Sequence, residues 1–418
     1  MPYQLLTEDK VVPYLAALPG LGRIFNSFED IEVREIGDGN LNFVYFVTDR
    51  QDRARCVVVK QAVPYVRVVG ESWPLTLGRT RLEVMALRRQ REICPSLVPE
   101  IYHWDEEMCV VVMQNLYRHK VVRGEIIKGV RFPRLVDHLT TFLARTLFFT
   151  SDFYLNQAEK KQLVGEFINP ELCKITEDLV FTDPFEDNAT NNPNPNLTAA
   201  DLEGLRGDAA LKVAAAEMKH KFMTEAESLL HGDFHLGSYM ANQEETYVID
   251  PEFAYVGPMG FDVGKTIGNF ILAYLSQDYH QRQAGQDPRG YRSWLLQGAQ
   301  DVWTGFAGKF EALWAEHMDR FDRVYWAFPG GAQAAAAFRA AFLERVFHDA
   351  LGYAGCVMVR RTLGLAKVAD IAAIPDLEAR AVLDRQALAI GRGLLVERNR
   401  LAGIEDAIRL VVSISPCA

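Results

Sequence analysis

The first third of the chain consists of short apolar segments separated by polar turns, a pattern typical of β-strands. Five segments have this character: residues 32–36, 43–47, 56–60, 101–104 and 108–113. Between the third and the fourth, Leu82, Met85 and Ala86 recur at helical spacing, which predicts a helix from about Arg79 to Ile93. We therefore expect an antiparallel sheet accompanied by one helix.

Beyond residue 117 the hydrophobic period changes to that of amphipathic helices. Long helices are expected near residues 133–151, 207–230, 290–318, 331–359 and 376–398. The stretch 182–197, rich in Asn and Pro, is expected to be a surface loop. Strands followed by helices predict an α+β protein with two lobes, residues 1–116 and 117–418.

The composition argues against several classes of protein. Of the 418 residues, 49% are hydrophobic and 24% charged, as expected for a globular protein of two domains. The formal net charge of −10 argues against a nucleic-acid-binding surface, which needs a dense basic face. No window holds the roughly 20 apolar residues of a membrane-spanning helix. Because the first ten residues also lack the features of a signal peptide, we expect a cytoplasmic protein without a membrane partner.

The six cysteines are expected to be reduced. They are scattered along the chain, without a Cys-x-x-Cys pair and without the Cys/His spacing of a zinc site. A cytoplasmic location favours small core residues or free thiols over disulfides.

Two acidic turns follow apolar runs in the second half of the chain. Asp233 comes after the run at 229–230, and Asp250 after the run at 247–249. Phosphoryl transfer needs one carboxylate that holds the attacking hydroxyl and another that holds the magnesium ion spanning the phosphates. Asp250 and Glu252 offer the oxygen ligands that magnesium prefers. Either aspartate alone is more often a simple turn residue, but the two together favour phosphoryl transfer.

The predicted sheet contains a candidate phosphate ligand. Lys60 ends the third apolar strand, where kinases place the lysine that holds nucleotide phosphates. Glu83, on the following helix, is placed to pair with Lys60, although a glutamate on a helix surface is as often only solvated. The turn at residues 37–40 is either a simple hairpin turn or part of a nucleotide site, since a short glycine pair is weak evidence by itself.

Together these motifs resemble the protein-kinase-like superfamily and, within it, the 5-methylthioribose kinases. The resemblance extends from about residue 30 to residue 395 and includes long strings in both lobes. These strings are residues 36–42, 59–67, 70–75, 148–153 and 257–262. Ser238 stands where other small-molecule kinases of this fold have Asn, and Asp250-Pro251-Glu252 takes the place of the Asp-Phe-Gly of protein kinases.

The resemblance implies that the γ-phosphoryl group of ATP is transferred to the 1-hydroxyl of 5-methylthioribose, a step of methionine salvage, by a homodimeric enzyme. Asp233 would orient this hydroxyl and accept its proton, while Asp250 and Glu252 would hold Mg²⁺. The expected nucleotide-binding residues are Asn40, Lys60, Gln114, Asn115, Leu116, Asp250, Pro251 and Glu252.

The resemblance also implies a role for two adjacent arginines. Arg360 and Arg361 would face the substrate and the transferring phosphoryl group, whose charge guanidinium groups stabilise. Adjacent helical residues point about 100° apart, so both reach one site only if the helix ends there, and Gly364 is consistent with such an end. The alternative is two surface arginines at a helix C-terminus.

Other residues are expected to have structural roles. His231 and His235 would shape the loop around Asp233 by hydrogen bonds, and Asp262 would cap a helix starting near Val263 and brace that loop. In the family that the chain resembles, the loop carrying Trp73 folds over the nucleotide side.

The chain departs from the family pattern at two places. Gln114-Asn115 replaces the usual Glu-Asp, and Phe234 and Leu236 replace smaller or polar residues. We expect the latter two beside the sugar pocket, where they can alter its shape. Two other functions therefore stay open: a kinase for another small alcohol or sugar, such as an aminoglycoside or choline, and a nucleotide-binding protein with little catalysis.

Overall fold

The computed structural model describes residues 3–37, 41–67, 70–320 and 325–417. Its N-terminal lobe contains a five-stranded antiparallel sheet with the order β1-β2-β3-β7-β6. The strands are β1 (Ile31–Glu35), β2 (Asn42–Asp49), β3 (Cys56–Ala62), β6 (Ile101–Asp105) and β7 (Val110–Gln114), with a separate hairpin of β4 (Tyr65–Val66) and β5 (Gly70–Pro74). The five predicted strands are confirmed, as is the helix α2 (Arg79–Ile93).

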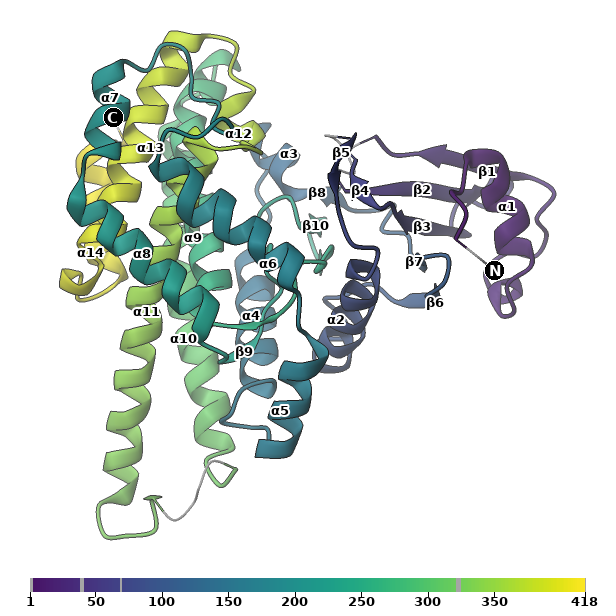
Figure 1. Cartoon of the computed structure of the whole chain (residues 1–418), viewed down its shortest axis with the longest axis horizontal. Coiled ribbons are helices and arrows are strands. Elements are labelled where there is room, and N and C mark those ends of the chain that lie inside the picture. Colours follow the sequence, from purple (N-terminus) through teal and green to yellow (C-terminus); the bar gives the residue numbers. More distant parts are fainter. Residues whose placement is uncertain (1–2, 38–40, 68–69, 321–324, 418) are drawn as a thin grey trace.

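Residues 110–113 of the strand β7 are all apolar because both faces of the strand are buried. Its side chains alternate between the two faces of the sheet, as the period of a strand requires. Val110 and Val112 pack in one core together with the helix α1 (Glu8–Ala16), whereas Val111 and Met113 pack in another core together with α2. Helices α1 and α2 thus cover the two faces of the sheet (Figure 1). The strand β3, which contains Lys60, is the central strand of the five.

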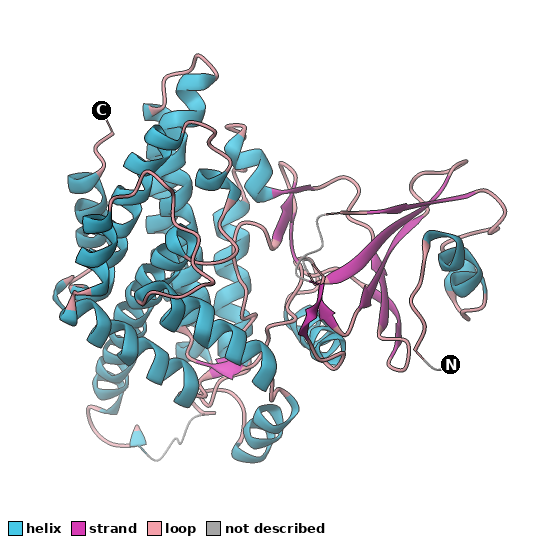
Figure 2. Ribbon diagram, turned by 45° about the horizontal axis from the view of Figure 1, so that its top comes forward, coloured by secondary structure: helices cyan, strands magenta, loops and turns pink. Residues whose placement is uncertain are grey.

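The C-terminal lobe is mostly helical, with only short strands (Figure 2). Its helices are α3 (Val122–Ile127), α4 (Leu135–Phe149), α5 (Gln157–Glu166), α6 (Pro170–Thr176), α7 (Ala199–Arg206), α8 (Ala209–Thr224), α9 (Gly260–Gln283), α10 (Arg289–Glu316), α11 (Gly331–Leu363), α12 (Ala369–Ala372), α13 (Leu377–Val396) and α14 (Ile404–Ile414). Its strands are β8 (Lys120–Val121), β9 (Ser228–Leu229), β10 (Tyr239–Ala241), β11 (Thr246–Val248) and β12 (Val256–Gly257).

Helices α9 and α11 approach each other closely at two glycines of α9. A Cβ atom on Gly264 of α9 would come within 2.2 Å of the carbonyl oxygen of Ala350 on α11. A Cβ atom on Gly260 would lie 2.9 Å from the backbone nitrogen of the same residue. Any side chain at Gly264 would therefore push the two helices apart.

Two of the sequence-based predictions need correction. The helix expected to reach residue 230 ends at Thr224, and Ser228–Leu229 forms β9, paired with β12. The expected surface loop 182–197 begins with a 3₁₀ turn, Asp183–Phe185, and is partly buried, because the amide of Asn194 donates hydrogen bonds to the carbonyl of Leu377 and to Asp384. Composition predicted the irregular backbone there but not its burial.

All six cysteines are free thiols, as expected. In the part of the chain that the structure describes, no helix combines the length and the apolar character needed to cross a membrane. We propose that the boundary between the lobes lies at residues 116/117, because β7 ends at Gln114 and the next strand, β8, pairs with β10 of the helical lobe.

Candidate active site

Lys60 lies between two carboxylates from distant parts of the chain. Its ammonium donates to Oε1 of Glu83 on α2 at 2.8 Å and to Oδ1 of Asp250 at 2.7 Å. Lys60 and Glu83 are buried, whereas about half of the Asp250 side chain is exposed. The predicted pairing of Lys60 with Glu83 is confirmed, and the contact with Asp250 connects the sheet with the helical lobe.

The charges around Lys60 keep it protonated. Burial alone would lower the pKa of the Lys60 ammonium, but Asp250, Glu83 and Glu252 together raise it above its ordinary value. Burial raises the pKa of the Glu83 carboxyl, and the Lys60 ammonium opposes that rise. The site therefore holds a permanent cation on the central strand of the N-terminal sheet.

The turn after β11 presents Asp250 and Glu252. Asp250 has a left-handed backbone with φ of 63°, a conformation that non-glycine residues rarely adopt and that often marks functional sites. The amide of Asn42 donates to Oε2 of Glu252 at 3.0 Å, and Nε of Arg79 lies 3.5 Å from the same oxygen. Asn169 fixes the same turn by donating to the backbone carbonyl of Glu252 at 2.9 Å.

This turn offers donors suited to magnesium. Asp250 and Glu252 are separated by one residue in this turn, and their carboxylate oxygens are the ligands that Mg²⁺ prefers. Among the described residues, no group of three or more His, Cys, Asp and Glu side chains is arranged to hold a metal ion. The two carboxylates fit a magnesium ion whose remaining ligands are phosphate oxygens and water.

The loop around Asp233 is shaped by Gly232 and Asp262. Gly232 has φ of 80°, and a Cβ atom there would lie 2.1 Å from the carbonyl oxygen of Phe253. The carboxylate of Asp262 accepts hydrogen bonds from the backbone N–H groups of His231 at 2.7 Å and Gly232 at 3.1 Å. Asp262 therefore braces the loop as expected, but it does not cap α9, which already begins at Gly260.

Asp233 is surrounded by positive charge. Its Oδ1 accepts a hydrogen bond from the ammonium of Lys265 at 2.5 Å, and its Oδ2 lies 3.2 Å from Nε2 of His235. A guanidinium nitrogen of Arg361 lies 3.9 Å from Oδ1. Burial alone would raise the pKa of the Asp233 carboxyl, but His235, Lys265 and Arg361 hold it well below its ordinary value. Asp233 is therefore ionised and able to accept a hydrogen bond from a substrate hydroxyl.

The two adjacent arginines lie at the end of α11, where Gly364 follows the last helical residue. Arg361 is buried, and one of its guanidinium nitrogens donates to the carbonyl of Ala366 at 2.6 Å. Within the described residues, the Nε atoms of Arg360 and Arg361 are buried without a hydrogen-bond partner. The helix thus ends directly after the two arginines, and the Asp233 carboxylate opposes the lowering of their pKa values by burial.

Both histidines of the loop are neutral. Burial lowers the pKa of His231 and of His235 to about 4. Nδ1 of His235 accepts from the N–H of Gly237 at 3.0 Å, which leaves the proton on Nε2 for donation to Asp233. Nδ1 of His231 likewise accepts from the N–H of Asp233, and Nε2 donates to the carbonyl of Ile249 at 2.9 Å. The expected structural role of these two histidines is thus consistent with the geometry.

Ser238 stabilises the loop around Asp233 by hydrogen bonds to the backbone. Its hydroxyl donates to the carbonyl of Asp233 at 2.8 Å, and its carbonyl accepts from the N–H of Ile249. The expectation that Phe234 and Leu236 lie beside a sugar pocket is wrong, because both are fully buried in the core of the helical lobe. The ring of Phe234 stacks on that of Phe142, with a distance of 5.3 Å between ring centroids.

The remaining predicted nucleotide contacts lie in the connection between the lobes and in the glycine turn. Gln114 is the last residue of β7, and its backbone N–H donates to the carbonyl of Glu100. Asn115 and Leu116 follow and are buried. Pro251 is buried between Asp250 and Glu252, and Asn40 lies outside the described residues. Trp73, on β5, is partly buried against Val66, Leu75 and Leu172.

Three polar residues of the site were not found from the sequence: Asn42, Arg79 and Lys265. Arg79 is fully buried and donates to Oδ1 of Asn42 at 2.8 Å, which in turn holds Glu252. Lys265 is a cation within a stretch of α9, residues 260–277, in which every residue is buried. Lys265 is the one cation within residues 260–277, and a cation in a mostly apolar helical segment is the signal that indicates it in the sequence.

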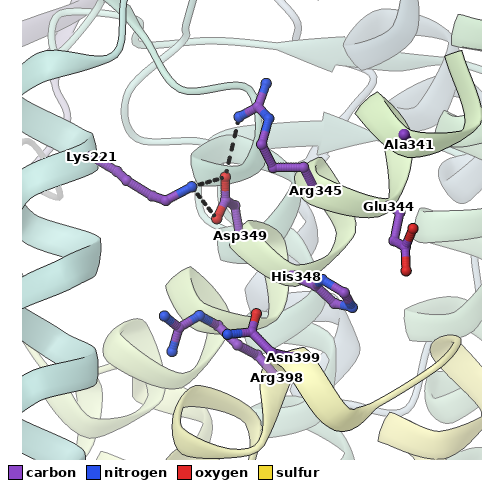
Figure 3. A pocket seen from close by; sticks show the side chains of 8 residues that line it. All are labelled: Lys221, Ala341, Glu344, Arg345, His348, Asp349, Arg398 and Asn399. Atoms are coloured by element: carbon purple, nitrogen blue, oxygen red, sulfur yellow. Dashed lines mark hydrogen bonds and ion pairs between the residues drawn. The ribbon is translucent and has the colours of Figure 1, made fainter. Parts of the chain in front are cut away.

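A hollow of about 380 Å³ lies elsewhere on the helical lobe (Figure 3). Its cations are neutralised, because Lys221 bonds Asp349 at 2.8 Å, Arg345 lies 3.5 Å from the same carboxylate and Arg398 pairs with Glu217. Arg345 precedes Arg360 by four turns of α11, which is about 22 Å along the helix axis. This hollow is therefore separate from the residues around Asp233.

The fold, with a lysine of the sheet bonded to one acidic turn and a second acidic turn in the helical lobe, is that of the small-molecule kinases with a protein-kinase-like fold. The profile of the phosphotransferase enzyme family (APH) matches residues 32–300. A methylthioribose kinase of Geobacillus kaustophilus is 45% identical over 98% of this chain and 96% of its own length. Methylthioribose kinase 1 of Oryza sativa subsp. japonica is 39% identical, with coverages of 97% and 94%.

The methylthioribose kinase of Klebsiella pneumoniae is 42% identical over 98% of both chains. Among solved structures, a glucosamine kinase in complex with glucosamine, ADP and inorganic phosphate aligns with a TM-score of 0.48 at 14% identity, covering 92% of this chain and 86% of that chain. The chain belongs to the phosphotransferase enzyme family and, within it, to the methylthioribose kinases.

Proposed function

We propose that this chain transfers the γ-phosphoryl group of ATP to the 1-hydroxyl of 5-methylthioribose, a step of methionine salvage. The observation that carries this proposal is the pair of acidic turns, one with Asp233 among cations and the other with Asp250 and Glu252 beside Lys60. The choice of 5-methylthioribose as the acceptor rests on the relatives named methylthioribose kinase, which match nearly the whole chain.

Asp233 would accept a hydrogen bond from the 1-hydroxyl, orient it toward the γ-phosphorus and take its proton as the phosphoryl group is transferred. The neighbouring cations keep Asp233 ionised and make it a weak base. Because an anomeric hydroxyl is more acidic than an ordinary alcohol, and because phosphoryl transfer passes through a loose transition state, orientation matters more here than basicity.

The cations of the site would stabilise the negative charge of the phosphates. Lys60 would hold phosphate oxygens, with Glu83 keeping its ammonium in place. Arg360 and Arg361 would contact the transferring group, and their buried Nε donors without a partner among the described residues fit an anionic ligand. Asp250 and Glu252 would hold Mg²⁺, which neutralises charge on the β- and γ-phosphate oxygens when bound.

Nucleotide binding is proposed for the residues between and around the lobes. The backbone groups of Gln114, Asn115 and Leu116 would contact adenine, so the loss of two side-chain charges there leaves that contact intact. Asn40 and Pro251 are the other residues proposed to contact the nucleotide. Phe234 and Leu236 have no exposed surface and therefore do not line a sugar pocket directly.

Two further proposals concern the enzyme in the cell. Cytoplasmic location follows from the composition and from a metabolic role. Homodimeric assembly follows from the family resemblance, and light scattering on the purified protein tests it by giving the mass of two chains of 47.1 kDa or of one.

The test of the proposed function is ADP release from ATP and Mg²⁺ with 5-methylthioribose, ribose, choline and an aminoglycoside offered separately. Selective turnover of 5-methylthioribose supports the proposal. Turnover of another acceptor alone would keep the kinase mechanism and overturn the substrate, and ATP binding without turnover of any acceptor would overturn the enzymatic function.

A further inference from the structure

Lys265 is a buried cation within an otherwise closely packed helix. It is 2% exposed, and α9 is buried on all sides around it. A buried ammonium costs free energy unless a charge and hydrogen bonds compensate it. Its ammonium donates to Oδ1 of Asp233 at 2.5 Å and to the carbonyl of Gly232 at 3.0 Å, and it lies 5.1 Å from the centre of the Phe261 ring.

Two donors hold the Asp233 carboxylate from opposite oxygens. Lys265 holds Oδ1, and Nε2 of His235 lies 3.2 Å from Oδ2. A carboxylate offers about four lone-pair positions, so each oxygen keeps one for a further hydrogen bond. The carboxylate is thus fixed in orientation and still able to accept a hydrogen bond from a substrate.

We propose that Lys265 is a positioning residue of the transfer reaction: its ammonium fixes the Asp233 carboxylate against the backbone of Gly232 in the orientation that the acceptor hydroxyl requires. This inference rests on the proposed kinase function. The rigid support is α9, which is locked to α11 by the close contact at Gly264, one residue from Lys265. A catalytic group attached to such a support keeps its geometry between turnovers.

The charges around Asp233 determine what removal of Lys265 does. The titratable and charged groups whose fields act on or near Asp233 include Arg123, His231, His235, Tyr239, Asp262, Lys265, Arg360 and Arg361. The Lys265 ammonium lowers the pKa of Asp233. Without it, that pKa rises, and the acid limb of the kcat/KM profile moves to higher pH because Asp233 must be ionised to accept the hydroxyl proton.

The chain contains a matched buried lysine for comparison. Lys160 on α5 is 3% exposed, lies 3.1 Å from a carboxylate oxygen of Asp152 and donates to the carbonyls of Thr150 and Glu227. It has the same kind of surroundings as Lys265 but no contact with Asp233. Lys160→Met therefore reports what the loss of a buried ion pair alone does to the enzyme.

The experiment compares Lys265→Met, Lys265→Gln and Lys160→Met with the unaltered enzyme. We expect Lys265→Met to lower kcat by about 10²-fold, the effect of a misplaced catalytic group, to leave KM for ATP unchanged and to shift the acid limb upward. Lys265→Gln, which keeps a donor without the charge, should recover part of kcat but not the position of the acid limb. Lys160→Met should lower thermal stability and leave kcat and the pH profile in place.

A Lys265→Met enzyme with normal kcat and an unmoved acid limb would overturn the inference, as would a loss of kcat that Lys160→Met shares. The proposed function is tested separately, by measuring whether the unaltered enzyme turns over 5-methylthioribose. If it does not, the crystal structure of Lys265→Met still decides the inference: a rotated Asp233 carboxylate supports it, and an unchanged one overturns it.

Discussion

The side-chain amide of Asn42 donates a hydrogen bond of 3.0 Å to Oε2 of Glu252, joining β2 of the sheet to the acidic turn of the helical lobe. Asn42 is itself held, because Arg79 donates to its Oδ1 at 2.8 Å. All three side chains are buried. The orientation of a proposed magnesium ligand therefore depends on residues of the other lobe, and the two lobes are coupled at the place where a nucleotide would bind.

Replacement of Asn42 should weaken magnesium binding. In Asn42→Ala, Glu252 loses the donor that orients it, and the loss of such an outer partner typically costs about 10- to 100-fold in metal affinity or activity. We expect the free magnesium concentration that gives half-maximal ADP release to rise by about this factor. Asn196→Ala is the matched control, since Asn196 makes a similar bond of 3.1 Å to Glu378 at the surface. An unchanged magnesium requirement in Asn42→Ala would contradict the assignment of Glu252.

Replacement of Asp233 should abolish most of the turnover. An amide in Asp233→Asn cannot take the proton of the acceptor, so kcat should fall by about 10²- to 10⁴-fold while KM for ATP changes little. Steady-state ADP release measures both constants. Asp152→Asn is the control, because Asp152 also lies 3.1 Å from a buried lysine, Lys160. The other partners of Lys160 are the carbonyls of Thr150 and Glu227. Near-normal kcat in Asp233→Asn would exclude Asp233 as the residue that accepts the proton of the acceptor hydroxyl.

Replacement of Glu83 should lower kcat/KM for ATP more than it lowers the stability of the protein. In Glu83→Gln, the ammonium of Lys60 keeps Asp250 as a partner, so the protein should lose less than the roughly 3–5 kcal/mol typical of a broken buried ion pair. Lys60 is then drawn to Asp250 alone, and we expect kcat/KM for ATP to fall by about 10- to 100-fold, the worth of one charge-assisted hydrogen bond.

Glu92→Gln on the same helix is the control for this prediction. Glu92 lies 3.5 Å from Arg89 at the surface, so its loss should change neither quantity. If urea unfolding showed a loss above 5 kcal/mol in Glu83→Gln with kcat/KM unchanged, Glu83 would be a structural residue only.

Local signals in the sequence were sufficient for the sheet and for the acidic turns. The apolar run around Val111 predicted a strand by its residue types alone, and the structure buries both of its faces. Asp233 and Asp250 likewise stood directly after apolar runs, which marked the two turns. The end of α11 before Gly364 was likewise predictable, because the two arginines can reach one site only at a helix end.

Contacts between distant segments were not predictable in this way. Asn42 and Glu252 are 210 positions apart, and Lys265 meets Asp233 across 32 positions. Nothing in the period of the surrounding helix or strand requires either pairing. The position of Phe234 was predicted wrongly for the same reason. A residue next to Asp233 in the sequence is expected to face the substrate, and only the structure shows that Phe234 packs on the distant Phe142 instead.

The pKa of His235 predicts that the protein loses stability in mild acid. Burial lowers this pKa to about 4 in the folded protein, whereas an unfolded histidine titrates near 6.5. Between these values only the unfolded state binds the proton, so stability is complete above pH 6.5 and falls as the pH is lowered toward 4. For His235 alone the loss between pH 7 and pH 5 amounts to roughly 2 kcal/mol.

Urea unfolding of the unaltered protein and of His235→Gln at pH 7 and pH 5 measures this loss. The glutamine amide can replace the donation to Asp233 without titrating, so the difference between the two pH values should shrink by about that amount. His220→Gln, at an exposed position of α8, should leave the difference unchanged. Equal pH dependence in His235→Gln and the unaltered protein would mean that His235 is already protonated in the fold, with Asp233 as the counter-ion of an imidazolium.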